Sequence, residues 1–600
     1  MSSVRTRLYP LLDRLILWRE RHISERYFIL LLALAIGITM SFLGNSLKYF
    51  IHSVESVLMS GISERSYLYL LWPAVGILLS GVFVRYILKD DISHGVTKVL
   101  SSISQRKSRI KLHNTWSSLL ASGITISFGG SVGAESPIVM TGAAIGSNFG
   151  RLFRLEQRNL MLLIGCGVAG ALGGIFKAPI TGLVFVIEVL LLDLTMASIL
   201  PLLISSVSAA AVSYMISGGA NHFSFSFTEP YYVERVPMMV LLGVICGLVA
   251  LYFSQTMFYL ERKLKGIERY LNRYVASVLM LSLLIFVFPP LYGEGYHIVD
   301  DLLNGQYGQL LENSFLEPFA TSFWTVAVFM LLVLLFKVFA SVATNSGGGC
   351  GGLFAPTIFV GAITGFLFSF VVNYLPWVKM YLPSKNYTLL GMAGLMSAVM
   401  HAPLTGVFLI AELSGGYDLF LPLMLVSMTA FGTIRIFMPH SIYSLRLAEQ
   451  GKLLTHQKDT AVLTLMNVEN VLEDDFEVVH PEMTLGELVR VVSISHRNSF
   501  PVVNKRGVLV GIVELDNIRN IMFRPELYDR PTHTVHKIMI SPRTVVRPSM
   551  SMPRIMQIFD ESKEWKLPVV SDEGQYLGFI SKSKIFNAYR SVLNDTFIGD

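Results

Sequence analysis

The sequence predicts an all-α polytopic membrane protein built from two inverted-topology repeats with broken helices, followed by a smaller α/β region. Three observations support this. Hydrophobic residues make up 52% of the chain and charged residues only 15%, against about 25% charged in soluble proteins, and the mean hydropathy is +0.55. Long uncharged runs are interrupted by glycine clusters that recur at a fixed offset. After about residue 448 charges become frequent, and the long apolar runs stop.

The same composition excludes several classes of protein. Three cysteines (Cys166, Cys246 and Cys350) are too few for a disulfide scaffold or a cysteine-rich metal module. The net charge of +6 comes from basic residues that lie between apolar runs, as the positive-inside rule expects of cytoplasmic loops. We therefore expect a lipid bilayer as the surroundings and no nucleic acid as a partner.

The first membrane span is predicted directly after a charged N-terminal segment, residues 1–26. Residues 27–46 carry no charge, and Lys48 ends the run; about 20 residues are what a spanning helix needs. The apolar run is longer than that of a cleaved signal peptide, so we expect a retained span with the N-terminus in the cytoplasm. With no long targeting extension, we expect a bacterial inner membrane rather than an organellar one, and both termini in the cytoplasm.

Two glycine clusters predict helices that are broken within the membrane. Residues 338–378 contain no Asp, Glu, Lys or Arg, which is more than one crossing, and their middle reads Ser346-Gly347-Gly348-Gly349-Cys350-Gly351-Gly352. A second cluster reads Gly129-Gly130-Ser131-Val132-Gly133. Backbone opened by glycine at membrane depth must be buried in protein or line a water-filled cavity. Half-helices around a central site are the expected result.

The two broken regions predict an internal repeat. Gly129, Gly130, Gly133, Pro137, Gly142, Ala143 and Gly146 recur 219 positions later as Gly348, Gly349, Gly352, Pro356, Gly361, Ala362 and Gly365. The segment Ala178-Pro179-Ile180-Thr181-Gly182 recurs 224 positions later as Ala402-Pro403-Leu404-Thr405-Gly406, and Glu188 falls on Glu412 at this second shift. Transporter folds often pair inverted repeats around a site at the bilayer midplane. We expect repeats at about 27–220 and 235–447 within a membrane domain spanning 27–447.

The last part of the chain, residues 448–600, is itself duplicated. Pro481, Met483, Pro501, Val502, Val503, Gly507 and Gly511 recur 67 positions later as Pro548, Met550, Pro568, Val569, Val570, Gly574 and Gly578. Short β segments are predicted at 499–503 and 508–513, and again at 566–570 and 576–580, alternating with helices. We expect two α/β copies, at about 466–524 and 535–593, that pack face to face in one small domain.

Glu135 is the first candidate functional residue, because it is the only formally charged residue between Lys111 and Arg151. A carboxylate at membrane depth is costly and by default functional. It lies in Gly133-Ala134-Glu135-Ser136-Pro137, and proline suits a first helical turn. The exposed N–H groups of such a helix start attract an anion. Glu135 can therefore act as a tethered anion that gates the site; the alternative is a capping carboxylate on a wet loop.

A second helix start has the same design, in Gly352-Leu353-Phe354-Ala355-Pro356. Two such starts that converge would form a pocket of backbone N–H donors around Ala134, Leu353, Phe354 and Ala355. This pocket would hold a partly dehydrated halide without a full positive charge. A cation filter would instead use carbonyls or rings of acidic residues.

These motifs resemble those of the CLC family of chloride channels and chloride/proton antiporters. Gly133-Ala134-Glu135-Ser136-Pro137 is similar to the family's G-x-E-G-P, with Ser136 in place of glycine, and Gly352-Leu353-Phe354-Ala355-Pro356 fits its G-x-F-x-P. Met438-Pro439-His440-Ser441-Ile442-Tyr443 resembles the segment with the pore tyrosine. The resemblance implies that Tyr443 offers its hydroxyl to the anion, that chloride is transported with no cofactor required, and that the protein is a homodimer with one anion pathway per subunit.

One motif departs from the family pattern. The family's G-S-G-I-P corresponds best to Ser93-His94-Gly95-Val96-Thr97, where His94 replaces the serine that helps to bind the anion. The resemblance places Ser93 and His94 at the anion site. A neutral imidazole can still donate one N–H, and protonation would add a charge. His94 could equally face water at the cytoplasmic edge, so the preferred anion stays open.

A further position bears on the transport mechanism. Family antiporters usually carry a proton-relay glutamate directly after the residue matched by Glu188, but this chain has Val189, which cannot titrate. We therefore expect a passive chloride channel gated by Glu135; the alternative is a chloride/proton antiporter. Glu188 and Glu412 are expected to satisfy helix ends or interfaces, with a proton-relay role as the alternative.

The soluble tail resembles a pair of cystathionine-β-synthase (CBS) motifs, which family members often carry as cytoplasmic regulators. Such pairs can bind adenine nucleotides. The usual ribose-binding aspartate is replaced by Asn517 and Lys584; Asp516 lies one position short, and Ser581 stands where a threonine or serine is expected. Nucleotide binding through Asp516 and Ser581 and a structural role in dimer contacts both stay open.

A function of another class is also considered: a CBS-bearing cation transporter, or a sensor without a pore. A cation path should show acidic or polar rings across its spans, and the sequence shows few intramembrane acids apart from Glu135 and Glu188. No catalytic triad, phosphate-binding loop or metal-ligand cluster stands out. We expect neither an enzyme nor a metal site.

Overall fold

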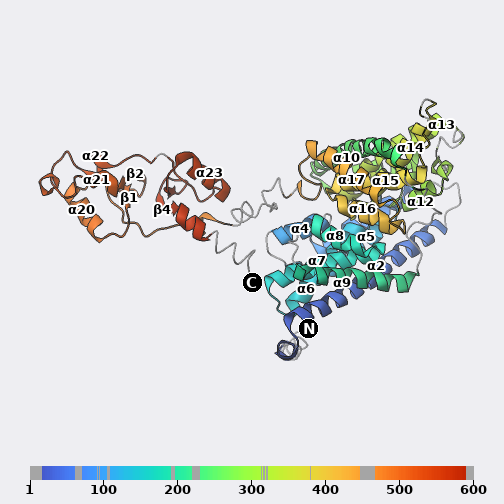
Figure 1. The fold of residues 1–600 in the computed structure, drawn as a ribbon, viewed down its shortest axis with the longest axis horizontal. Coiled ribbons are helices and arrows are strands. Elements are labelled where there is room, and N and C mark those ends of the chain that lie inside the picture. The colour runs from blue at the N-terminus through green and yellow to red at the C-terminus, as the bar shows by residue number, and fades with distance from the viewer. Residues whose placement is uncertain are drawn as a thin grey trace. The chain divides into compact units, whose positions relative to one another are not determined.

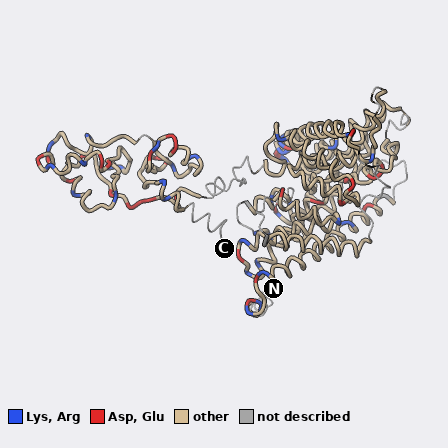
Figure 2. Tube along the Cα trace, viewed as in Figure 1, with Lys and Arg blue, Asp and Glu red and all other residues tan. Residues whose placement is uncertain are grey.

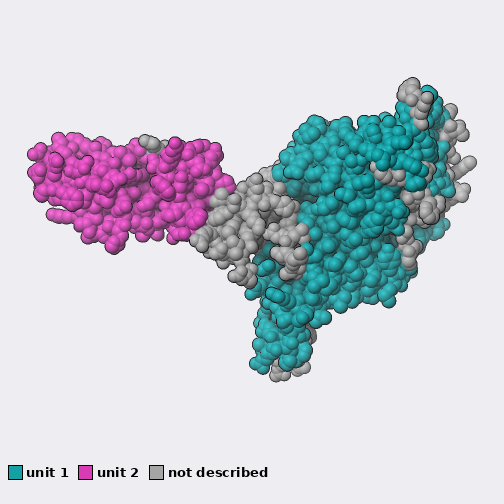
Figure 3. All heavy atoms as spheres, viewed as in Figure 1, with its two compact units in different colours: residues 1–453 teal, residues 454–600 magenta. Residues whose placement is uncertain are grey.

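The computed structural model describes residues 17–60, 70–90, 92, 95–104, 109–190, 196–218, 230, 232–311, 314, 318, 322–376, 378, 380–445, 447, 466–542 and 544–588. The chain divides into two compact units, Met1–Leu453 (unit 1) and Leu454–Asp600 (unit 2) (Figures 1 and 3). Unit 1 is helical, as predicted. Figure 2 shows long stretches without charge along its helices, whereas charged residues are frequent in unit 2.

The first half of unit 1 contains α2 (Glu25–Ser60), α3 (Trp72–Val82), α4 (Gly95–Ser104), α5 (Ser117–Ser127), α6 (Glu135–Leu152), α7 (Gln157–Phe176), α8 (Pro179–Glu188) and α9 (Met196–Ser217). The second half contains α10 (Val236–Lys265), α11 (Tyr270–Val287), α12 (Tyr296–Leu303), α13 (Phe323–Gly347), α14 (Phe354–Tyr374), α15 (Ser384–Met400), α16 (Pro403–Leu413) and α17 (Phe420–Phe437). Among the described residues, 8 helices are long and apolar enough to cross a membrane.

The first span is longer than predicted. Helix α2 continues through Lys48 to Ser60, although the sequence suggested that the charge would end it. The Lys48 Nζ donates a hydrogen bond of 2.5 Å to the carbonyl oxygen of Ile175 at the end of α7. Because this ammonium has a partner inside the protein, it does not have to lie at the water boundary.

The two halves repeat the same packing order. Helix α6 packs on α7, α7 on α9 and α8 on α9; correspondingly, α14 packs on α15, α15 on α17 and α16 on α17. The repeated glycines lie at the closest crossings. A Cβ at Gly146 would lie 2.0 Å from the carbonyl oxygen of Leu163, and one at the equivalent Gly365 would lie 1.9 Å from that of Tyr387. Both helix pairs therefore require glycine for backbone contact.

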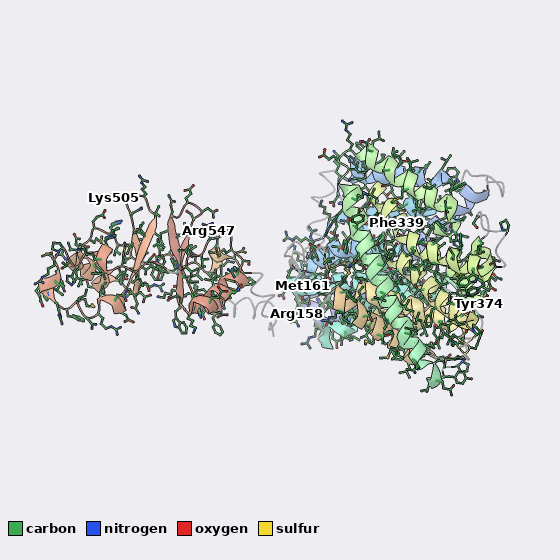
Figure 4. The ribbon with its side chains drawn as sticks, turned by 90° about the horizontal axis from the view of Figure 1, so that it is seen from above. Arg158, Met161, Phe339, Tyr374, Lys505 and Arg547 are labelled. Atoms are coloured by element: carbon green, nitrogen blue, oxygen red, sulfur yellow. The ribbon has the colours of Figure 1, made fainter. Side chains whose placement is uncertain are left out.

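Aromatic residues gather where α13 begins and α14 ends. The rings of Phe323 and Tyr374 stack with centroids 3.6 Å apart, and Trp324 packs edge-on against Tyr374. Figure 4 labels Tyr374 at this cluster and Phe339 further along α13. Trp324 and Tyr374 are exposed, as expected of amphipathic rings at a membrane–water interface.

Unit 2 consists of two α/β copies. Strands β1 (Ser499–Val503) and β2 (Leu509–Glu514) pair antiparallel, as do β3 (Lys566–Val570) and β4 (Tyr576–Ser581). The helices are α20 (Leu485–Ile494), α21 (Leu515–Ile518), α22 (Val535–Ile538) and α23 (Met552–Ser562). A bridge between Val508 and Gln575 joins the two hairpins, and Lys505 and Arg547 extend outward from this unit (Figure 4). The predicted strands are confirmed within one residue at each end.

Candidate functional site

The two glycine-opened loops of unit 1 meet each other directly. Gly133 and Gly352 form an isolated antiparallel bridge: the Gly133 N–H donates to the Gly352 carbonyl at 2.9 Å, and the Gly352 N–H donates back at 2.7 Å. Because each residue stands two positions before a helix, this bridge brings the starts of α6 and α14 side by side. The predicted convergence of two broken helices is therefore confirmed.

Glu135 is the first residue of α6 and lies at this junction. Its side chain is 2% exposed, so it does not stand on a water-facing loop. Its Oε1 accepts a hydrogen bond of 2.6 Å from the hydroxyl of Tyr296, the first residue of α12. The carboxylate also lies near the backbone amide of Ala355 at the start of α14. Three helix starts thus surround one buried carboxylate.

A small cavity of about 20 Å³ lies beside the bridge. It is lined by Val96, Thr97, Ser136, Met257, Asn345, Gly351, Gly352, Leu353, Ile442 and Tyr443. This volume suffices for about one water-sized guest. The Tyr443 hydroxyl is buried and has no hydrogen-bond partner within the described part of the chain, so it is available to a guest in the cavity.

The other predicted anion-binding residues have different environments. Leu353 lines the cavity, whereas Phe354 is 2% exposed and its ring stacks on that of Phe176. Ala355 is buried against Gly133. The Ala134 N–H, which we predicted to face an anion, donates instead to the carboxylate of Glu294 at 2.9 Å. Ser93 and His94 lie outside the described residues.

Ser136, which replaces a glycine of the family motif, contributes a hydroxyl to the cavity. Its Oγ accepts a long hydrogen bond of 3.4 Å from the Val96 N–H at the start of α4. A Cβ added at Gly352 would lie only 2.8 Å from the Cβ of Ser136. The serine therefore fills the space between α4 and the glycine bridge.

Three polar residues around this junction are not predicted from the sequence: Glu294, Tyr296 and Lys337. Lys337 in α13 is fully buried, and its Nζ donates to Ser131 Oγ at 2.8 Å and to the Gly293 carbonyl at 3.1 Å. A usable signal existed for the lysine. It is the only formally charged residue between Glu317 and Lys379, and the same isolation marks Glu135 as a candidate.

Glu188 and Glu412 satisfy helix starts, as predicted. The Glu188 carboxylate accepts from the N–H groups of Leu404 and Thr405 at the start of α16. The Glu412 carboxylate accepts from the N–H groups of Ile180 and Thr181 at the start of α8. Val189, which follows Glu188, is buried at 6% exposure and carries no group that can hold a proton.

In unit 2 both predicted nucleotide-binding side chains are engaged within the protein. The Ser581 hydroxyl donates to the Glu473 carboxylate, and Asp516 forms a surface ion pair of 2.6 Å with Arg519. Glu473 also pairs with Arg497 at 3.0 Å. The hydrogen bond from Arg497 lowers the pKa of Asp475 from its ordinary value. Among the described residues no group of three or more His, Cys, Asp or Glu is placed to hold a metal ion.

Comparison with known proteins identifies the relatives of this chain. Residues 76–435 match the family model described as voltage gated chloride channel, and residues 468–524 and 535–591 match the CBS domain. A putative chloride channel protein ClcB-like of Ralstonia nicotianae is 29% identical over 63% of this chain and 85% of its own length. The H(+)/Cl(-) exchange transporter ClcA of Vibrio cholerae is 27% identical over 52% of this chain and 64% of its own length.

Solved structures show the same fold. A slow cyanobacterial Cl-/H+ antiporter has a TM-score of 0.60 and 20% identity, covering 71% of this chain and 98% of its own. The expected CLC-type membrane fold is therefore confirmed, because this match extends over nearly the whole of that protein.

The expectation of a passive channel is wrong. It depended on Val189 alone, and it is overturned by relatives named proton/chloride exchange transporters. The physical reason is that one missing carboxylate does not interrupt proton movement if other groups or water can carry the proton. Since the family model matches more than half of the sequence, the chain belongs to the voltage gated chloride channel (CLC) family and carries a pair of CBS domains.

Proposed function

We propose that this protein exchanges chloride for protons across a membrane. The observation that carries this proposal is the position of Glu135, a buried carboxylate between the starts of α6 and α14, beside a cavity of the size of one small guest. The relatives named H(+)/Cl(-) exchange transporters support the same conclusion.

The proposed mechanism alternates a carboxylate and a chloride at the same donors. When Glu135 is ionised, it is held by the Tyr296 hydroxyl and by the positive ends of two helices. When a proton binds, the neutral acid loses this attraction and leaves the donors to an incoming chloride. Departure of the proton to the other side lets the carboxylate return and displace the anion. Each transport cycle therefore moves protons and chloride in opposite directions.

The chloride would be held at the cavity by groups without a full positive charge. The Tyr443 hydroxyl and the Leu353 backbone are the candidates that the family motifs also mark, and Ser136 adds a second hydroxyl. Ser93 and His94 stay predictions for the anion path from the side of α4. Weak, multiple contacts of this kind let an ion bind and leave again.

The surroundings of the protein are part of the proposal. We infer a bilayer-embedded homodimer with one anion pathway per subunit, in a bacterial inner membrane, with both termini in the cytoplasm. The CBS pair would act there as a regulator, with an adenine nucleotide as its candidate ligand. The apolar helices of unit 1 support the embedding in a bilayer, and the two CBS matches support the presence of the regulatory pair.

The test is flux from chloride-loaded liposomes with simultaneous recording of external pH. We expect an outward chloride gradient to drive protons uphill into the liposomes. In the Glu135→Gln variant, chloride should still move but proton movement should cease, because the amide cannot titrate. Glu268→Gln, an exposed glutamate after α10, is the matched control and should exchange normally. Chloride flux without any proton movement in the wild-type protein would contradict the proposal.

A further inference from the structure

The loop between α11 and α12 is fixed against the broken loop that precedes α6. The Gly293 N–H donates to the Gly129 carbonyl at 3.1 Å. Gly129 has a φ of +88°, and a Cβ there would lie 2.2 Å from the Tyr292 ring. Gly295, with a φ of +90°, is packed in the same way on Phe359. These close contacts hold Glu294, between the two loop glycines, in one position.

Lys337 links this loop to the loop that precedes α6. Its buried Nζ donates both to Gly293 of the α11–α12 loop and to Ser131 of the α5–α6 loop, and it lies 4.6 Å from the centre of the Phe359 ring. An ammonium group in a protein interior is tolerated only when its donors and its charge are compensated. Glu294 is the acidic group whose charge acts on Lys337.

The Glu294 carboxylate occupies a helix start that a chloride could otherwise use. Its Oε1 accepts the Ala134 N–H directly before α6, an 18-residue helix. Glu135 stands next to it, hydrogen-bonded to Tyr296 and near the Ala355 amide of α14. Two carboxylates thus accept hydrogen bonds from N–H groups at the starts of α6 and α14. Each of them prevents an anion from binding to the same N–H groups.

We propose that Glu294 is a second gating carboxylate, which must take up a proton before a chloride can use the Ala134 amide. This inference rests on the proposed chloride/proton exchange. Glu294 is partly exposed, whereas Glu135 is 2% exposed, so Glu294 is the more accessible carboxylate of the pair. A water-borne proton binds its carboxylate; the neutral acid is a weaker acceptor for an N–H, and the amide becomes available to the anion.

The charged and titratable neighbours make this step sensitive to pH. Glu135 of α6 and Glu55 of α2 oppose a negative charge on Glu294. Lys48 of α2 and Lys337 of α13 favour that charge. Tyr296 of α12 interacts electrostatically with both carboxylates. Because two like charges in one buried region repel each other, the proton affinities of Glu135 and Glu294 are coupled.

The test compares the pH dependence of chloride flux in liposomes for the wild-type protein, Glu294→Gln and the control Glu268→Gln. Two coupled carboxylates can change flux by more than about tenfold per pH unit, whereas one can give at most about tenfold. We expect the wild type and the control to exceed this limit on the steepest part of the curve. The Glu294→Gln variant should stay below it, with flux at alkaline pH raised by at least about fivefold.

A structural readout uses bromide as the probe. Crystals grown at alkaline pH should show anomalous scattering at the Ala134 amide in the Glu294→Gln variant and none there in the wild type. A pH profile for Glu294→Gln equal to that of the wild type, or absence of bromide at this amide in the variant, would overturn the inference. If Glu294→Gln does not yield monodisperse protein, Glu294→Asp is used. Its shorter side chain withdraws from the amide and should also raise alkaline flux, and unchanged flux would count against Glu294.

The proposed chloride/proton exchange and the proposed role of Glu294 can be refuted independently of each other. If the wild type moves chloride but no protons, exchange is wrong whatever Glu294 does. If the wild type exchanges and Glu135→Gln abolishes proton movement, but Glu294→Gln behaves as the wild type, only the second gate is wrong.

Discussion

The Glu188 carboxylate accepts hydrogen bonds from both the backbone N–H and the side-chain hydroxyl of Thr405, each at 2.8 Å. Glu412 makes the same two contacts with Thr181, at 2.9 and 2.6 Å. The end of α8 therefore caps the start of α16, and the end of α16 caps the start of α8. This reciprocity follows from the internal repeat and ties the two halves of unit 1 together.

The reciprocal caps predict that Glu188→Gln destabilises the protein without changing proton coupling. An amide keeps one acceptor oxygen but loses the charge that the helix start attracts, at a cost of about 1–2 kcal/mol. Thermal unfolding in detergent should show a lower midpoint, and the ratio of protons to chloride in liposomes should equal that of the wild type. Glu268→Gln should change neither. An unchanged midpoint together with lost coupling would instead make Glu188 a proton carrier.

The repeat could be found in the sequence because close helix contact leaves a visible pattern. Where α6 crosses α7, the backbones touch, so Gly146 cannot be replaced; where α14 crosses α15, the same holds for Gly365. Glycine at a backbone crossing and proline at a helix start are local requirements, so both copies retain them at one offset. The meeting of Gly133 and Gly352 followed from that symmetry.

The partners of Glu135 could not be predicted in the same way. Tyr296 reaches it from 161 positions away, through a loop that has no counterpart among the repeated motifs. The Ala134 amide looked available in the sequence, because only the folded loop shows that Glu294 already accepts its hydrogen. The sequence predicts that Lys48 ends a span, because its partner on α7 is set by helix packing and leaves no local pattern.

Tyr296→Phe should raise chloride flux at neutral pH. The variant removes the hydroxyl that donates to Glu135 Oε1 at 2.6 Å. A hydrogen bond to a charged group contributes about 1.5–3 kcal/mol, so the blocking position of Glu135 should lose at least about tenfold in occupancy. Chloride efflux from liposomes measures this directly, with Tyr307→Phe, on the short helix Tyr307–Leu311, as the control. Flux equal to the wild type would show that Tyr296 does not hold Glu135.

Lys337 and Glu294 should show strong coupling in a double-mutant cycle. Removing one member leaves the other without its compensating charge in the protein interior, and we expect Lys337→Met alone to cost about 3–5 kcal/mol. In the double variant Lys337→Met/Glu294→Gln neither charge is left uncompensated, so part of the loss should be recovered. Thermal unfolding of the full chain in detergent provides the four values. Additive losses would mean that the two side chains act independently.

The Glu473 carboxylate is the residue of unit 2 that bears most directly on nucleotide binding. It accepts the Ser581 hydroxyl and pairs with Arg497 at 3.0 Å, so the side chain that we predicted for a nucleotide already has an internal partner. A carboxylate at this place also repels a phosphate group. Binding by the wild-type chain should therefore be weak for an electrostatic reason.

Glu473→Ala is expected to strengthen nucleotide binding at least about tenfold, which corresponds to about 1.4 kcal/mol. The substitution frees the Ser581 hydroxyl and leaves the Arg497 guanidinium, which suits phosphate oxygens. Binding of a fluorescent ATP analogue to the full chain in detergent measures the change, with Glu573→Ala, an exposed glutamate between β3 and β4, as the matched control. The further change Ser581→Ala in the Glu473→Ala background should reverse part of the gain, because the hydroxyl is then missing. If Glu473→Ala binds the analogue no better than the wild type, Ser581 is not part of a nucleotide site, and the Ser581–Glu473–Arg497 contacts serve only to join β4 to the segments before α20 and before β1.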